Sequence, residues 1–474
     1  MKRFYFPFFS IVSSFFFQTS YAQRIDTTLA AYADKYQPER IYIQFDKPAY
    51  AAGETVWFKA YLMAGILPSG ISKNFYTDWY DASGNLLAHS VFPVVQAGAA
   101  GEFVIPDTLS SAAVHVKAYT TWLLNFDTAF LFQKNIPIAQ KKPPKTIAKL
   151  NAVPTLQFFP EGGDAIEGLP SRIAFLALDQ YGRPVKIKGT VTNSKGETID
   201  NLKTEHDGMG SVHVTYAKGE TYTAKWYDEQ NNVHTSALPA AKSSGASFEI
   251  GVAAGKKTFV IRRTEVAPDN LKQLHIVATM HQQLVYMANA NLEQTSTIGG
   301  AIPTAALVTG ILQITLFTDD WKPLAERICF VNNNDAVFTP EVGFTTLVLG
   351  KRGMNTIEIS MPDSVVGNLS LAVTDKGIGV DSNNTIVSQL LMSSDIKGSV
   401  FKPQYYFSNN SDSVSKHLDL VMLTHGWRRI NWEAIVQGEI PQLKYPAETD
   451  YLTFSGKVFG ANSTQIRSAG ELYA

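Results

Sequence analysis

Between Pro38 and Leu62 the chain alternates apolar and polar positions in two runs. Apolar residues take every second position in 41–45 and again in 56–62, which predicts two half-buried β-strands. Residues 46–54 between them hold Asp, Pro and Gly, which favour a tight reversal, so we expect an antiparallel pair. The second strand is predicted to place Val56, Phe58 and Ala60 in the core and Trp57, Lys59 and Tyr61 on the opposite face.

The same alternation returns along most of the chain, with turn residues about every ten positions, a spacing typical of β-sandwiches. Two polar connectors, 141–145 with Lys and Pro and 241–245 with Ser and Gly, are predicted to be bending points open to proteases. We therefore predict an all-β fold of tandem antiparallel β-sandwich domains. The predicted β domains span 23–140, 150–240, 246–333 and 334–400.

The period changes from two to about three and a half near the C-terminus. Apolar residues within 418–422 share a helical face, and Asn431 can cap a second short helix, so we predict a helical hairpin over 416–438. A strand pattern resumes in 450–474, which is too short for a core of its own. At the other end, a short helix capped near Asp26 is predicted to lie across the edge of the first sheet.

The first residues have the pattern of an export signal. Lys2 and Arg3 precede an apolar run, 4–17, and the small-residue site Ser20–Ala22 follows, which predicts a signal peptide over 1–22. The run is shorter than the roughly 20 residues that a spanning helix needs, so no membrane-spanning segment is expected after cleavage. We expect the mature chain to be secreted across the inner membrane and to reside in the periplasm or at the outer membrane.

Composition narrows the classes of partner. The 474 residues carry a formal net charge of -1, which gives no field to attract nucleic acid, so no nucleic-acid partner is expected. Hydrophobic residues make up 45% of the chain, enough for several cores and too many for a disordered protein. Cys329 is the one cysteine of the sequence, which excludes a disulfide within the chain.

The sequence holds no enzyme motif, so we predict that the protein is not an enzyme and assign no catalytic, cofactor-binding or metal-binding residues and no cofactor. Glu161–Asp164 lacks the lysine of a phosphate loop and is interpreted as a tight turn. The side chains of Asp319–Asp320 are expected to point to opposite sides. The oxygen-rich loops 332–335 and 381–384 are interpreted as ordinary turns and not as calcium sites. His425 is expected to pack between the two short helices.

Several segments carry a resemblance to a known family. ERIYIQFDKPAYAAGETVWFKAYL resembles the second macroglobulin (MG2) domain of bacterial α2-macroglobulins, and QFFPEGGDAIEGLPSRIAFLALDQYGRPV is similar to the module that follows it. ITLFTDDWKPLAERICFVN and DLVMLTHGWRRINW are similar to later signatures of macroglobulin-like envelope proteins of Bacteroidota. The resemblance implies macroglobulin-like sandwiches over most of the mature chain. Many such relatives continue into a carboxypeptidase-regulatory-like domain and a TonB-receptor plug, and TFSGKVFG resembles the start of the former, so 450–474 is expected to be its truncated beginning.

The thioester motif of the family is missing from this sequence. Thioester-bearing α2-macroglobulins carry Cys-x-Glu-Gln, whereas Cys329 is followed by Phe330, Val331 and Asn332. The alternation around Cys329 predicts a strand position in which cysteine behaves as a small apolar residue.

The resemblance implies an exported macroglobulin-like binding or scaffold protein of the cell envelope, with non-covalent endopeptidase inhibition as an implied activity. The alternative is the periplasmic N-terminal part of a TonB-dependent outer-membrane transport or receptor assembly. The expected partners are proteases in the first case and outer-membrane transport components in the second. Both stay open at this point, because binding surfaces on sandwich loops and edges leave no motif.

Overall fold

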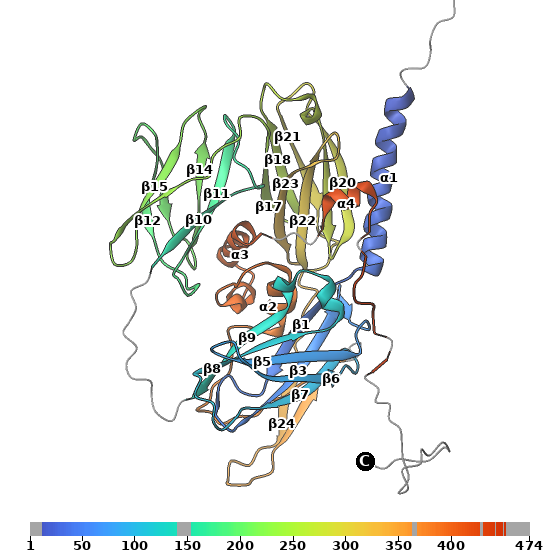
Figure 1. The fold of residues 1–474 in the computed structure, drawn as a ribbon, viewed down its shortest axis with the longest axis vertical. Coiled ribbons are helices and arrows are strands. Elements are labelled where there is room, and N and C mark those ends of the chain that lie inside the picture. The colour runs from blue at the N-terminus through green and yellow to red at the C-terminus, as the bar shows by residue number, and fades with distance from the viewer. Residues whose placement is uncertain are drawn as a thin grey trace, which may run out of the picture.

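The computed structural model describes residues 12–139, 153–362, 367–426, 430–440, 442–448 and 450–451, with side chains from residue 24 onward. Strands in mainly antiparallel sheets are the dominant regular structure, and the helices are short apart from the first (Figure 1). The predicted all-β fold class is confirmed. Three sandwiches follow one another along the chain, and helical segments lie where they meet.

The first sandwich packs a four-stranded sheet against a five-stranded sheet. The four-stranded sheet holds β1 (Glu39–Phe45), β3 (Thr55–Ala64), β4 (Leu67–Pro68) and β7 (Gly98–Val104). The five-stranded sheet holds β2 (Tyr50–Ala51), β9 (Phe132–Ala139), β8 (Ala113–Tyr119), β5 (Asn74–Asp81) and β6 (Leu86–Pro93). The short 3₁₀ helices η1 (Trp122–Asn125) and η2 (Thr128–Phe130) lie between β8 and β9.

β1 and β3 form the predicted antiparallel pair, with Phe45 opposite Phe58. Phe58 and its inward neighbours Val56 and Ala60 are buried, whereas Trp57 is 55% exposed. A strand of period two can bury only one of its two sets of side chains. The register predicted from the alternation is therefore confirmed.

The second and third sandwiches each pack a three-stranded sheet against a four-stranded one. The second consists of β10 (Thr155–Pro160), β11 (Pro170–Leu178) and β14 (Met209–Thr215) against β13 (Thr198–Lys203), β12 (Lys188–Asn193), β15 (Tyr222–Tyr227) and β16 (Val233–Ala237). The third consists of β17 (Ala246–Ala253), β18 (Lys256–Arg263) and β21 (Thr297–Pro303) against β20 (Gln283–Asn291), β19 (Gln273–Met280), β22 (Gly310–Thr318) and β23 (Pro323–Val331), with η3 (Asp269–Leu271) before β19.

Residues 334–400, predicted as a fourth β domain, hold one hairpin within their described part, formed by β24 (Glu341–Thr346) and β25 (Thr356–Ser360). Its apolar cross-strand pairs share a face on which Val342 and Phe344 are more than half exposed. A lone hairpin is marginally stable, so this region depends on its neighbours. The limits of all the domains stay predictions. The helical segments that follow are α2 (Ile386–Leu391), η4 (Ser393–Asp395) and η5 (Pro403–Phe407).

Two short helices lie in the region predicted to be helical, α3 (Asp412–Thr424) and α4 (Trp432–Gln437). Ser411 caps α3, and the predicted cap Asn431 accepts a hydrogen bond from the backbone of α4. The buried side chains of the two helices belong to different clusters. Figure 1 shows α3 between the second and third sandwiches, whereas α4 packs with the N-terminal helix α1 (Val12–Lys35).

The predicted position of the N-terminal helix is wrong. α1 already covers Asp26 in mid-helix, and it packs on the third sandwich and α4 instead of on the first sheet. The outer face of the third sandwich is itself apolar at this place, and periodicity identifies the apolar face of a helix but not the surface that covers it. The contacting residues include Ile25, Leu29 and Tyr32 of α1, Val277 and Phe317 of the sheet, and Trp432 and Ile435 of α4.

The connector 241–245 is not the bending point that its composition predicts. Lys242 N donates to Ala165 O (2.8 Å), and Lys242 O accepts from Glu167 N (2.9 Å). These backbone bonds fasten the connector to the second sandwich, a partner that the local sequence does not reveal. The connector 141–145 lies outside the described residues.

Candidate functional site

The segment after β10 carries Glu161 from the second sandwich to the third. Glu161 N donates to Arg172 O (2.8 Å), which continues the pairing of β10 with β11. Gly162 follows with a φ of +84°, a left-handed conformation that suits glycine. A Cβ at Gly162 would lie 3.3 Å from Phe248 O of β17, so the glycine lets the two sandwiches approach closely.

Four charged side chains meet at this junction. Glu161 Oε1 accepts from Arg327 Nε (3.0 Å) and from Ile250 N (3.2 Å). Arg327, whose side chain is 2% exposed, also donates through Nη2 to Asp419 Oδ1 on α3, and Asp419 Oδ2 accepts from Arg172 Nη1 (3.0 Å). Two carboxylates and two guanidinium groups thus join the second sandwich, the third sandwich and α3. We call Glu161, Arg172, Arg327 and Asp419 the junction cluster.

The two carboxylates of the junction cluster differ in proton affinity. Burial raises the pKa of Glu161, and the nearby charges of Arg327 and Arg172 only partly oppose it. Burial also acts to raise the pKa of Asp419, but the same two arginines outweigh it and the pKa of Asp419 is lowered. The contrast fits the hydrogen bonds, because both oxygens of Asp419 accept from arginine, whereas Glu161 Oε2 has no hydrogen-bond partner within the described part of the chain.

A cleft of about 450 Å³ lies beside the junction cluster, between the end of β10, β23 and the end of α3. Its apolar lining consists of Phe158, Phe159, Pro160, Ile328, Met422 and Leu423. Its charged lining consists of Glu161, Glu326, Arg327 and Lys397. Apolar walls with a few converging polar groups, in a space of this size, are typical of binding sites. We call this space the junction cleft.

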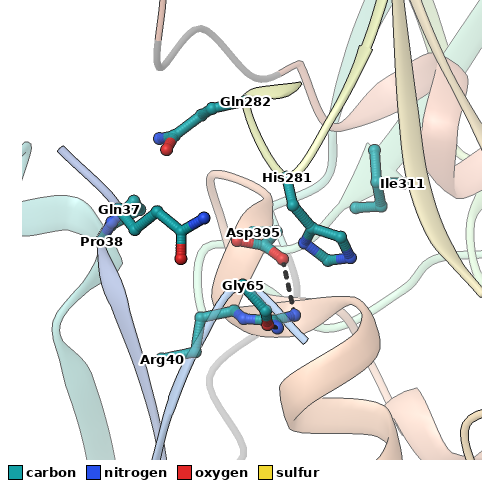
Figure 2. Close-up of a pocket in the computed structure, with 8 residues that line it drawn as sticks. All are labelled: Gln37, Pro38, Arg40, Gly65, His281, Gln282, Ile311 and Asp395. Atoms are coloured by element: carbon teal, nitrogen blue, oxygen red, sulfur yellow. Dashed lines mark hydrogen bonds and ion pairs between the residues drawn. The ribbon is translucent and has the colours of Figure 1, made fainter. Parts of the chain in front are cut away.

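A second, much smaller cavity of about 20 Å³ lies where the first sandwich meets the third (Figure 2). Arg40 of β1 forms an ion pair with Asp395 (3.2 Å) on one side, and the turn between β19 and β20 supplies His281 and Gln282 on the other. Gln282 is 3% exposed, and its carboxamide has no hydrogen-bond partner among the described residues. The space suffices for one water molecule, so this contact is a joint between sandwiches and not a ligand pocket.

Cys329 lies on β23 and is buried in the core of the third sandwich, as predicted. Burial raises the pKa of its thiol to about 11, so the reactive thiolate is scarce at neutral pH. Asn332, three residues later, donates its amide to Asn410 Oδ1 (3.0 Å). These contacts assign Cys329 to packing.

The carboxylate pair and the two oxygen-rich loops are held by structural contacts. The Asp320 carboxylate pairs with Lys322 (2.6 Å) in the turn after β22, which lowers its pKa to about 2. Asp335 accepts from Thr309 N (3.0 Å), and Asp381 pairs with Lys134 (2.7 Å). Among the described residues, no three His, Cys, Asp or Glu side chains are grouped so that they could hold a metal ion.

His425 does not pack between the two short helices, and that prediction is wrong. It follows the last turn of α3, where it is buried beside Gly398 and Thr424, and this burial lowers its pKa. α4 packs with α1, and His425 at the end of α3 lies beside the loop at Gly398.

The sequence predicted the turn at Glu161–Asp164 correctly and missed its role in the junction cluster. The sequence did contain one signal of a buried ion pair. Arg327 interrupts the apolar run of β23, and a charged side chain in a buried strand requires a partner. Its partners lie 166 and 92 residues away in the chain, so no local pattern could name them.

Comparison with known proteins adds little. No protein-family model matches the chain, and no curated protein sequence matches it. Among solved structures, similarity extends to Salmonella alpha-2-macroglobulin reacted with methylamine (8% identity, 69% of this chain, 25% of that one, TM-score 0.20) and to trypsin-activated alpha-2-macroglobulin of Escherichia coli (11%, 66%, 25%, 0.21). A tetra-tandem repeat of a large adhesion protein is similar at 13% identity, over 63% of this chain and 75% of that one, with a TM-score of 0.17.

These similarities are too weak to support a conclusion about function or domain arrangement. The chain spans about a quarter of the length of the two alpha-2-macroglobulins. Within the described residues, no helix combines the length and the apolar character needed to cross a membrane.

Proposed function

We propose that this chain is an exported, macroglobulin-like binding and scaffold protein of the bacterial cell envelope. The observation that carries the proposal is the way the sandwiches meet. Side chains of the second sandwich, the third sandwich and α3 share one buried apolar cluster, and the junction cluster adds buried ion pairs to it. Such a joint holds separate sandwich surfaces in a fixed arrangement, which suits a protein that binds other proteins.

The proposed action is non-covalent binding of protein partners, with peptidases as the first class. Cys329 lies in a core with a raised pKa, and Asn332 is engaged with Asn410, so the residues at the thioester position support packing instead of trapping. Any restraint of a peptidase then depends on surface contacts and steric hindrance. The proposal includes no enzymatic activity and no cofactor.

The test is to mix the mature chain with endopeptidases of different specificity and follow the mixture by size-exclusion chromatography. We expect co-elution with at least one peptidase, including its catalytically inactive variant, and slower cleavage of a protein substrate than of a small chromogenic substrate. The inactive variant separates binding from digestion. Absence of co-elution with every active and inactive peptidase would contradict this function.

The second candidate function is the periplasmic part of a TonB-dependent outer-membrane assembly. It is supported by the path of the chain toward residues 450–474. Glu448 accepts from Asn74 N (2.8 Å) and Thr121 Oγ1 (2.8 Å), which fastens that path to the first sandwich. Co-purification of outer-membrane transport proteins in place of peptidases, from an envelope fraction cross-linked before lysis, would favour this candidate.

A further inference from the structure

We propose that the junction cleft binds the side chain of a lysine from a partner protein, with Glu161 accepting a hydrogen bond from the ammonium group. The inference rests on the proposed function for the nature of the partner, and on the geometry of the cleft for its chemistry. The cleft does not depend on any peptidase being that partner.

Only one of the two carboxylate oxygens of Glu161 accepts hydrogen bonds from described residues. Glu161 is buried in the lining of the cleft, and its Oε1 already accepts from Arg327 Nε and Ile250 N. Its Oε2 has no hydrogen-bond partner in the part of the chain that the structure describes. A buried carboxylate oxygen without a donor is costly, so a donor brought by a ligand is favoured there.

The availability of one oxygen selects the kind of cation. A guanidinium group binds a carboxylate best through both oxygens at once, and Arg327 already holds Oε1 of Glu161. An ammonium group is a point donor that needs one oxygen. The free position therefore suits a lysine side chain better than an arginine side chain.

The apolar lining suits the rest of a lysine side chain. Phe159, Ile328 and Met422 belong to β10, β23 and α3, and all three line the same cleft as Glu161. Lysine has four methylene groups between backbone and ammonium, and such stems are commonly buried along apolar surface while the charge reaches a polar group. A volume of about 450 Å³ is sufficient for this stem.

The experiment titrates the full chain with three small probes and measures dissociation constants by NMR. n-Butylammonium reproduces the lysine side chain, n-butylguanidinium carries the larger cation, and n-butanol carries the same stem without charge. We expect n-butylammonium to bind about tenfold more tightly than either of the others. Equal affinity for n-butanol and n-butylammonium, or no binding of n-butylammonium at millimolar concentrations, would overturn the proposal.

Two variants localise the binding. Glu161→Gln should weaken the binding of n-butylammonium about tenfold. Thermal unfolding of this variant must also be measured, because Glu161 forms an ion pair with Arg327. Lys397→Ala removes a half-exposed cation from the rim and should strengthen n-butylammonium about threefold without affecting n-butanol. Lys195→Ala is the matched control, since it removes another exposed lysine that pairs with a carboxylate. It should change neither the affinity for n-butylammonium nor that for n-butanol. Unchanged affinity in Lys397→Ala contradicts binding in this cleft.

The outcomes separate this inference from the proposed function. If a peptidase co-elutes with the chain and n-butylammonium neither binds nor competes, the lysine cleft is wrong and the binding function stands. If n-butylammonium binds as described and no peptidase co-elutes, the cleft stands and peptidase binding is wrong.

Discussion

At the scale of single residues, the alternation of apolar and polar positions decides what is buried. Phe58 is packed among other aromatic rings, including Phe45, Phe75 and Trp79. Trp57, the preceding residue on the same strand, faces the other way and is more than half exposed. Size and hydrophobicity alone would predict deeper burial for Trp57 than for Phe58, but the period-two alternation of the strand buries Phe58 instead.

We predict that Phe58→Ala lowers the free energy of unfolding by about 3–5 kcal/mol, because it leaves a cavity among well-packed rings. The neighbouring substitution Trp57→Ala should cost less than about 1 kcal/mol. Urea denaturation followed by circular dichroism measures both. A larger loss in Trp57→Ala than in Phe58→Ala would show that the register of β3 is wrong.

Cys329 provides a second prediction at this scale. The buried thiol, with its pKa raised to about 11, should resist iodoacetamide at pH 8 in the native protein and react after unfolding in urea. Treatment of native protein with methylamine should release no thiol and add no mass to the chain. Release of one thiol together with addition of methylamine, detected by mass spectrometry, would instead show a thioester.

At the scale of elements, α3 depends on the ion pairs of Asp419 as well as on its apolar face. We predict that Asp419→Asn lowers the free energy of unfolding by about 3–5 kcal/mol at pH 7, because Arg327 then keeps a buried charge with fewer partners. The control Asp164→Asn breaks an exposed ion pair with Lys242 and should cost at most about 1 kcal/mol.

The pH dependence of this loss has a definite sign. The pKa of Asp419 is lowered in the folded state, so its stabilisation is present above the unfolded pKa of about 3.9 and is lost as pH falls through the folded pKa. The difference between the parent and Asp419→Asn should therefore shrink below about pH 4. A difference that grows with acidity would contradict the charge assigned to Asp419. Glu161, whose pKa is raised, acts in the opposite direction.

Elements also mark the limit of what the sequence could predict. Strand register followed from local alternation, as at β3, and helix caps followed from single residues, as at Asn431. The docking of α1 on the third sandwich could not be predicted from the sequence, because an apolar helix face fits any apolar surface of similar shape. The junction cluster could not be predicted either, because its ion pairs join residues from segments that are far apart in the chain.

At the scale of the whole molecule, the two connectors should respond differently to protease. Connector 141–145 offers lysines beside prolines, whereas Lys242 is held by backbone hydrogen bonds to the second sandwich. We predict that brief trypsin treatment cuts first at Lys141 or Lys145 and spares Lys242. Mass spectrometry of the first fragments measures this. A first cut at Lys242 would contradict the fixed joint between the second and third sandwiches.

The central claim is that α3 and the junction cluster hold the second and third sandwiches in one arrangement. It is tested most directly by the distance between spin labels at Lys195→Cys and Lys256→Cys, two exposed positions on different sandwiches, with Cys329 left unlabelled because it is buried. We expect one narrow distance distribution in the parent and a broader one after Asp419→Ala. A broad distribution in the parent, unchanged by Asp419→Ala, would contradict it.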